Sequence, residues 1–274
     1  MIILNFFNTK FRLIKLYINK KLMNLKKNII NLVKYPLLSI KLFIKILKDI
    51  FLKKVVEKNS KNFFENNNMI KYFISGAEKE VCPDYIDLKN LYGLIRERKP
   101  KCVVEFGSGF STIAITLALK ENKLKDNVSG RLFSVDGNED WIKNTEKKIN
   151  SELKKFVKFH YSKPIIARYN GQIVSLHDNL PDVSPNFIYL DGPSPLDVVG
   201  EKHGLSFKSN SRRIVAADPL LYESTAPADF FILVDRRYTN SNFLEKNLIY
   251  DYKVVKKIHF GGFVTFEKKY QPYP

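Results

Sequence analysis

Cysteine is scarce in this chain of 274 residues, which holds only two, Cys82 and Cys102. They stand far apart and lack metal-ligand spacing, which argues against a disulfide-stapled scaffold and against a structural zinc site. Cys102 begins an apolar run. We therefore expect both to be reduced structural thiols of a cytoplasmic protein.

Long apolar runs are also absent. No uncharged stretch approaches the ~20 residues that a membrane-spanning helix needs. Lysines interrupt every apolar block near the N-terminus, and no cleavage-like site follows them, which argues against a signal peptide. The sequence therefore predicts neither a spanning helix nor a secretory leader.

Acidic residues are few and unevenly placed. The chain has 46 Lys and Arg against 28 Asp and Glu, a net charge of +18. Residues 1–60 hold 14 basic residues against 2 acids, whereas the rest holds 32 against 26. Most of the excess charge thus lies on less than a quarter of the chain. This asymmetry argues against a basic groove on the larger part, and so against nucleic acid as its main substrate.

The basic part reads as a helical arm. In residues 37–56, Lys41, Lys45 and Lys48 recur at helical spacing on one stripe, while Ile, Leu and Phe fill the remainder. Pro36 suits a first helical turn. Such a helix can lie in a membrane interface. It could equally pack on the domain or on a second copy of the chain in a homo-oligomer, and RNA is a further alternative.

The arm divides the chain into two predicted parts. Residues 2–33 repeat the basic and apolar mixture less regularly, and residues 59–68 are polar, which predicts a linker. We therefore expect a basic amphipathic helical arm and linker over 1–68 and a domain over 69–274.

One stretch of the domain predicts a ligand site. The apolar run 102–104 leads to an acid at Glu105, then to Gly107 and Gly109, and then to a helix over 111–119. Strand, glycine turn and helix bring backbone close to a small ligand at the carboxyl end of a strand, where open α/β sheets hold nucleotides. A carboxylate there can hold the hydroxyls, or an ammonium group, of a nucleoside ligand.

The third glycine of the dinucleotide-binding fingerprint is missing, because Thr112 stands in its place. An acid followed by Gly-x-Gly resembles instead the first motif of class I S-adenosylmethionine-dependent methyltransferases. The resemblance implies an α/β, Rossmann-like fold and S-adenosylmethionine as cofactor. It also implies that the cofactor is bound by Glu105, Gly107, Ser108, Gly109 and Ser111.

Two further predicted strands end in acids. Residues 131–135 lead to Asp136, and residues 186–190 lead to Asp191. The resemblance implies that Asp136 holds the ribose hydroxyls and that Asp191 faces the methyl-donating end of the cofactor. Each acid alone could also cap the following helix.

The remaining pattern completes a sheet. We expect a helix over 84–98 capped by Asp84, a strand over 156–161, a hairpin over 165–176 around Asn170-Gly171, a strand over 230–234, a helix from about Asn240, and strands over 250–259 and 262–267. The resemblance implies a seven-stranded, mostly parallel sheet closed by this antiparallel C-terminal strand pair. No acid follows the strand over 156–161, so the way in which adenine is held stays open.

Methyl transfer to a hydroxyl needs a group that removes the proton. The loop after Asp191 holds His203, the best candidate for a general base, although an exposed loop histidine is the simpler interpretation. Asp191 and Asp235 could share a divalent cation, but Arg236 stands where metal-dependent relatives have an asparagine. We expect His203 and Asp191 to be catalytic and no metal to be required.

Pairs of arginines offer another kind of contact. They could clamp an anionic acceptor or form a solvated face, and they are Arg212, Arg213, Arg236 and Arg237. The segment after Asp191 lacks the Pro-Pro-aromatic sequence of amino-group methylation in nucleic acids. The predicted function is O-methylation of a small molecule or glycan. A nicotinamide-dependent oxidoreductase and a non-enzymatic, membrane-associated scaffold remain as alternatives.

Overall fold

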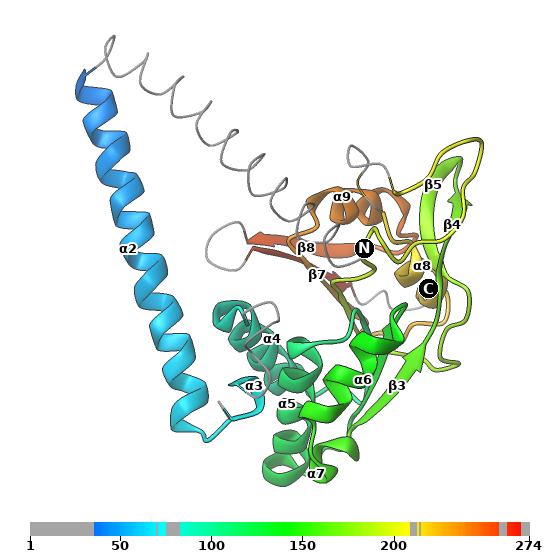
Figure 1. Cartoon of the computed structure of the whole chain (residues 1–274), viewed down its shortest axis with the longest axis horizontal. Coiled ribbons are helices and arrows are strands. Elements are labelled where there is room, and N and C mark those ends of the chain that lie inside the picture. Colours follow the sequence, from blue (N-terminus) through cyan, green and yellow to red (C-terminus); the bar gives the residue numbers. More distant parts are fainter. Residues whose placement is uncertain are drawn as a thin grey trace, which may run out of the picture. The chain divides into compact units, whose positions relative to one another are not determined.

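The computed structural model describes residues 36–69, 71–74, 83–208, 213, 215–257 and 262–269. The chain forms two compact units, Met1–Val56 and Glu57–Pro274. Helix α2 (Pro36–Asn66) begins in the first unit and ends in the second (Figure 1). The helix predicted over 37–56 is confirmed, and Pro36 is its first residue. The segment 2–33 lies outside the described residues.

The predicted linker over 59–68 is wrong in its conformation, because α2 continues to Asn66. Its polar residues surround Phe64, which is fully buried and packs edge-to-face on Phe73 with ring centroids 4.9 Å apart. Tyr92 lies against the same ring. This apolar anchoring favours helix over an extended connection.

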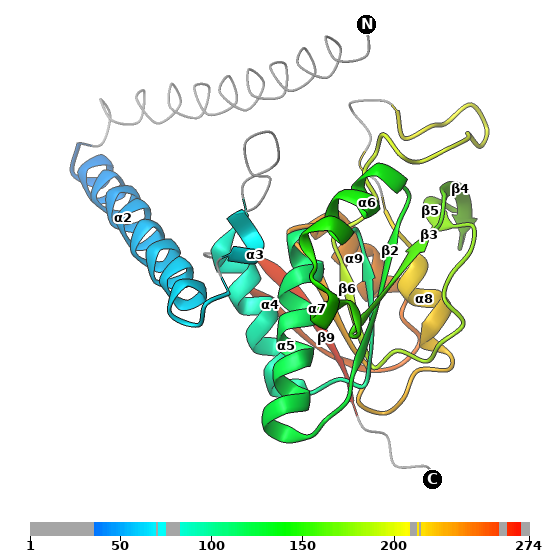
Figure 2. The ribbon, with the colours of Figure 1, turned by 60° about the horizontal axis from the view of Figure 1, so that its bottom comes forward.

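The second unit is built on a seven-stranded sheet in the order β3-β2-β1-β6-β7-β9-β8 (Figure 2). The strands are β1 (Cys102–Phe106), β2 (Arg131–Asp136), β3 (Val157–Tyr161), β6 (Phe187–Leu190), β7 (Phe231–Asp235), β8 (Tyr252–Lys257) and β9 (Phe263–Lys268). The first five pair in parallel, and β9 is antiparallel to both β7 and β8. The predicted Rossmann-like fold class, with its antiparallel C-terminal pair, is confirmed.

Helices cover both faces of this sheet (Figure 2). They are α3 (Lys71–Ile74), α4 (Tyr85–Arg98), α5 (Phe110–Asp126), α6 (Glu139–Lys148), α7 (Ser151–Lys154), α8 (Asp218–Glu223) and α9 (Tyr238–Asn247). Strand side chains alternate between the faces. Val103 packs with α4 and α5, whereas Val104 packs with α8 and α9. The same alternation directs Glu105 to the α5 face and Phe106 to the opposite one.

The predicted hairpin is also present. Strands β4 (Pro164–Tyr169) and β5 (Gln172–His177) pair around Asn170 and Gly171, whose φ angles of +46° and +73° fit a type I′ turn. The hairpin packs on the α8 and α9 face through Val174. It therefore covers part of the sheet face that Phe106 occupies.

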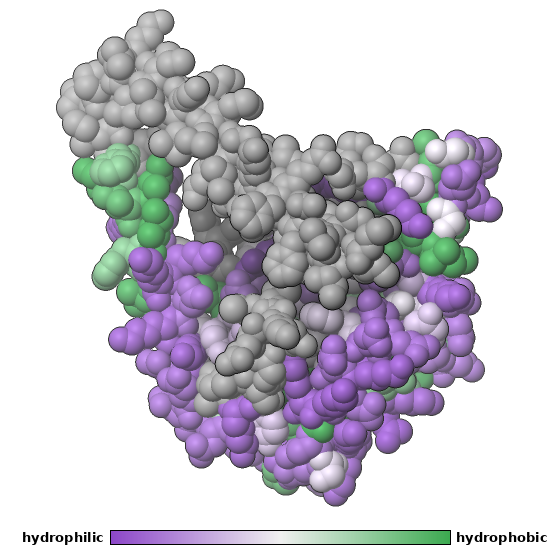
Figure 3. All heavy atoms as spheres, in the orientation of Figure 1, coloured by the Kyte–Doolittle hydropathy of each residue, from purple (hydrophilic) through white to green (hydrophobic). Residues whose placement is uncertain are grey.

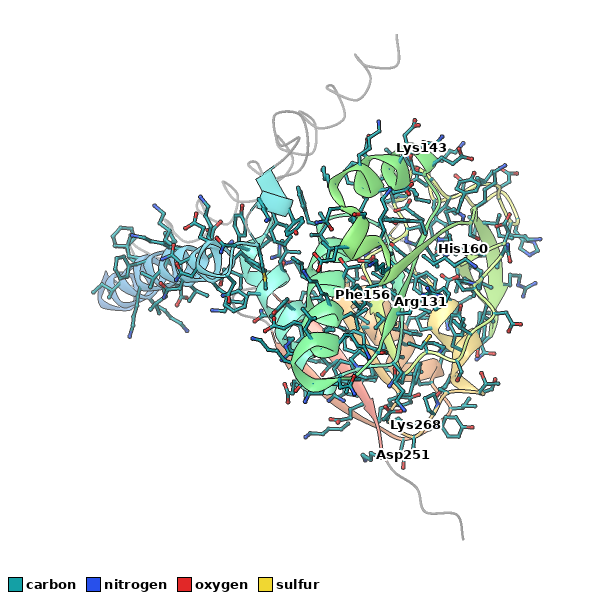
Figure 4. The ribbon with its side chains drawn as sticks, turned by 90° about the horizontal axis from the view of Figure 1, so that it is seen from below. Arg131, Lys143, Phe156, His160, Asp251 and Lys268 are labelled. Atoms are coloured by element: carbon teal, nitrogen blue, oxygen red, sulfur yellow. The ribbon has the colours of Figure 1, made fainter. Side chains whose placement is uncertain are left out.

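The parallel strands run in the same direction, so their amino-terminal ends lie at one edge of the sheet and their carboxyl ends at the opposite edge. Arg131 and Phe156 lie at the amino-terminal edge of β2 and β3, with His160 further along β3 (Figure 4). The Leu132 amide donates to the Phe156 carbonyl at 2.8 Å. The chain runs outward from β1 to β3 and then returns to the other side of β1 for β6. The winding reverses there, and the carboxyl ends of β1 and β6 are where such sheets bind ligands.

Candidate active site

The glycine turn after β1 brings the ends of two strands together. Gly107 has a φ of +103°, and a Cβ added to it would lie 3.1 Å from the backbone nitrogen of Gly192. The Gly192 amide in turn donates to the Phe106 carbonyl at 2.5 Å. The fold therefore needs glycine at 107, both for its backbone conformation and for this close approach.

Gly109 is different, because the fold does not require glycine there. Its backbone is extended, and an added Cβ would meet only the indole nitrogen of Trp141, at an ordinary contact distance of 3.6 Å. Trp141 donates its indole N–H to the Ser108 carbonyl. Gly109 immediately precedes α5, whose first amides form the end of a helix dipole. A glycine that the fold does not require is expected where a ligand approaches the backbone closely.

The carboxyl of Glu105 lies in a cluster of hydroxyl groups. Its Oε2 accepts from Thr112 Oγ1 at 2.6 Å and from Ser134 Oγ at 2.8 Å, whereas Oε1 has no hydrogen-bond partner among the described residues. The Ser111 hydroxyl also lies close to the carboxyl. Burial raises the pKa of Glu105 to about 7, and the charge of Asp191 adds to this rise. Oε1 of Glu105 could therefore accept a hydrogen bond from a ligand donor or pair with a ligand cation.

Asp136 joins the turn after β1 to the end of β2. It accepts from the Ser108 amide at 2.7 Å and from the Asn138 amide at 2.9 Å. Burial raises its pKa, and the nearby charge of Asp197 adds to this effect. Each oxygen accepts one bond and the residue keeps 9% of its surface, so the carboxylate has acceptor capacity left for a ligand hydroxyl.

The two arginines after β7 have partners within the protein. Arg236 donates to Asp84, at 2.5 Å, and to Asp87 at the start of α4. Arg237 donates to the Asp191 carbonyl, and its Nε lies 3.8 Å from the Asp191 carboxylate. For Arg236 and Arg237, these pairs argue against the clamp on an anionic acceptor, which was one of the two alternatives that the sequence left open. Of the other arginine pair, Arg212 lies outside the described residues and Arg213 is exposed.

Asp191 follows β6, and Asp235 is the last residue of the neighbouring strand β7. Burial raises the pKa of Asp235, and the charge of Asp191 adds to it. Arg236 and Arg237 oppose this rise. In the part of the chain that the structure describes, no group of three or more His, Cys, Asp or Glu has the geometry of a metal site. With arginines already beside both acids, these residues do not fit a shared divalent cation.

No protein-family model matches the chain, and no curated protein matches it. Solved structures do resemble it, and three methyltransferases are among them. The O-methyltransferase TomG from Streptomyces achromogenes, in complex with SAM, is 11% identical over 81% of this chain and 95% of that chain, with a TM-score of 0.43. An O-methyltransferase from Bacillus cereus with SAH is 12% identical over 81% and 97%, with a TM-score of 0.43. A Podospora anserina methyltransferase with SAH is 14% identical over 78% and 88%, with a TM-score of 0.41.

His203 lies in an exposed turn between Lys202 and Leu205, with a left-handed φ of +53°. This placement agrees with the simpler interpretation of an exposed loop histidine. Its role as a general base stays a prediction.

A second histidine was not anticipated. His177, at the end of β5, is bound to Asp218 at the start of α8: the Asp218 Oδ1 accepts from the His177 amide at 2.7 Å and lies 3.1 Å from its Nδ1. Both side chains are buried, and the imidazole stacks on Phe106 with ring centroids 5.4 Å apart. The pair thus supports the last residue of β1, directly before the glycine turn. The only sequence signal is that the predicted hairpin stops one residue before His177.

Proposed function

We propose that this protein is an S-adenosylmethionine-dependent methyltransferase. The observation that carries the proposal is the buried carboxyl of Glu105 beside the glycine turn. Glu105 is buried there with a free oxygen, and its pKa is raised by burial and by Asp191. A positively charged ligand would stabilise the ionised form of this buried carboxyl. The sulfonium and ammonium groups of S-adenosylmethionine carry such a charge. The anionic pyrophosphate of a dinucleotide would be repelled by the same acids, which disfavours an oxidoreductase.

The described residues fit this cofactor in three places. The turn from Gly107 to Gly109 would lie along its amino acid part, beside Glu105 and the hydroxyls of Ser108 and Ser111. Asp136 would accept from the ribose hydroxyls. Asp191, which follows β6 at the reversal point of the sheet, would face the methyl-donating end.

The acceptor is proposed to be a hydroxyl of a small molecule or glycan. Bound S-adenosylmethionine would supply an electrophilic methyl group, so the chain itself has to orient the hydroxyl and remove its proton. Asp191 is the described carboxylate best placed for this, and His203 is the second candidate. Neither assignment requires a metal ion.

Calorimetric titration of the full chain with S-adenosylhomocysteine, and in parallel with NADH, tests the proposal. We expect micromolar binding of S-adenosylhomocysteine alone. Asp136→Ala should weaken that binding at least about tenfold, the loss of a charged hydrogen bond. Asp140→Ala removes an equal charge from an exposed position near the start of α6 and should leave it unchanged. Binding of NADH alone would establish the oxidoreductase, and binding of neither would favour the scaffold.

We also propose that residues 37–56 contact a membrane surface peripherally. No helix among the described residues is long and apolar enough to cross a membrane. The support for a peripheral contact is the exposure of apolar side chains along the first part of α2.

A further inference from the structure

The first part of α2, residues 43–52, exposes a continuous apolar face. Phe43, Leu47, Ile50 and Phe51 follow one another at helical spacing and keep between 50% and 67% of their surface. Apolar atoms gather along this part of the helix (Figure 3). Because exposed apolar patches of this kind mark interaction surfaces in soluble proteins, this face calls for an occupant.

The opposite face of the same segment is basic. Lys45, Lys48 and Asp49 are exposed there, and Lys41 precedes Lys45 by one turn. Leu52 lies on this basic face as well, because it follows Lys48 by four residues and Lys45 by seven. Asp49 is the only acid among residues 37–56, which hold five lysines. The segment therefore combines a broad apolar face with an almost uncompensated positive charge.

Three occupants can be compared by whether each would cover the apolar face and whether each would neutralise the lysines. A second copy of the chain could cover the apolar face, but it would bring a second +12 arm and a further positively charged body. RNA would satisfy the lysines and leave Phe43, Leu47, Ile50 and Phe51 in water. A bilayer with anionic headgroups takes up the apolar face at the acyl boundary and attracts the lysines at the same time.

We propose that the first part of α2 lies in the interface of a membrane that contains anionic lipid. This inference rests on the peripheral contact proposed above and names its partner, and it does not depend on methyl transfer. The helix would lie parallel to the surface, with Leu47 at the centre of the inserted face and Lys45 and Lys48 toward the headgroups and water.

Vesicle co-sedimentation of the full chain tests this partner. We expect binding to vesicles of phosphatidylcholine and phosphatidylserine, and at least about tenfold weaker binding to phosphatidylcholine alone. Raising the salt concentration to ~0.5 M should weaken the binding, since it screens headgroup attraction. Equal binding to both vesicles would overturn the anionic requirement. Concentration-dependent self-association without vesicle binding would replace the membrane with a second copy, and binding of RNA alone would replace it with RNA.

Two serine substitutions separate insertion from a general effect on the helix. Leu47→Ser removes the centre of the apolar face and should weaken vesicle binding about tenfold. Leu52→Ser makes the same chemical change on the lysine stripe and should leave the binding within about twofold. Equal losses would contradict the proposed orientation. Lys45→Glu with Lys48→Glu should abolish the preference for anionic vesicles.

The same preparations separate this inference from the catalytic proposal. Every arm variant should bind S-adenosylhomocysteine as the unchanged protein does, because the substitutions lie outside the cofactor site. Vesicle binding without cofactor binding would uphold the membrane partner and refute the methyltransferase. Cofactor binding without vesicle binding would do the reverse.

Discussion

The hydroxyl of Thr112 donates a 2.6 Å hydrogen bond to Glu105 Oε2. Thr112 stands where a dinucleotide-binding fingerprint has its third glycine. The residue that breaks this fingerprint is therefore a buried hydrogen-bond partner of Glu105. The same hydroxyl oxygen accepts from the Gly109 amide at 2.9 Å. One side chain thus ties the acid of β1 to the turn and to the first turn of α5.

Thr112→Val should destabilise the protein, and more so at pH 8 than at pH 5.5. The variant leaves ionised Glu105 with one hydroxyl fewer, which costs about 1–3 kcal/mol for a buried charged group. When Glu105 is protonated, the loss is smaller. Urea unfolding at both pH values measures this difference. Thr116→Val, which removes a buried hydroxyl bound only to helix carbonyls, should show no such pH dependence.

Glu105→Gln should abolish a pH dependence of stability in the unliganded protein. The carboxyl has a pKa of about 7 when folded and 4.5 when unfolded, so the folded state binds more protons between these values. Its contribution to stability therefore falls as pH rises from 4.5 to about 7, by about 3 kcal/mol in all. Urea unfolding across this range should show that slope disappearing in the glutamine variant. An unchanged slope would assign it to other groups.

The acids of the site could be predicted because each follows an apolar run, and the carboxyl ends of parallel strands meet at one edge of a sheet. Their partners could not. Ser134 lies 29 residues from Glu105 on the neighbouring strand, and alternation predicts the face of a side chain but not which hydroxyl meets it. Arg236 binds Asp84 across 152 residues, a contact that only the sheet order creates.

The error at residues 59–68 has a similar origin. Composition alone favours a linker there, because polar residues dominate. Burial of one aromatic side chain, Phe64, outweighs them, and its partners Phe73 and Tyr92 lie further along the chain. The hairpin, by contrast, was predictable because Asn170 and Gly171 specify their turn locally.

Alanine at the two glycines of the turn should separate folding from binding. Gly107→Ala forces a side chain into a left-handed conformation and against Gly192, which should lower the free energy of unfolding by about 1–3 kcal/mol. Gly109→Ala should keep the melting temperature and lose affinity for S-adenosylhomocysteine. Thermal melts and calorimetry on both variants measure the two effects. Retained affinity in a folded Gly109→Ala protein would move the cofactor away from this turn.

His177→Phe should leave the buried Asp218 without its imidazole partner and lower stability by about 1–3 kcal/mol. Asp218→Leu with His177→Phe removes both polar groups, so the double variant should be more stable than the sum of the single losses predicts. Urea unfolding of the four proteins gives this coupling energy. Additive losses would show that the two side chains do not act as a pair.

The strand order has a consequence for how the protein is made. β9 is synthesised last, yet it lies between β7 and β8 in the sheet. Until residues 263–268 leave the ribosome, β8 has no neighbour in the sheet and the edge of β7 stays unpaired, open to contact with other nascent chains. The sheet is therefore completed only after residues 263–268 have been translated, and a chain released before β9 has an unpaired β8 and an open edge on β7.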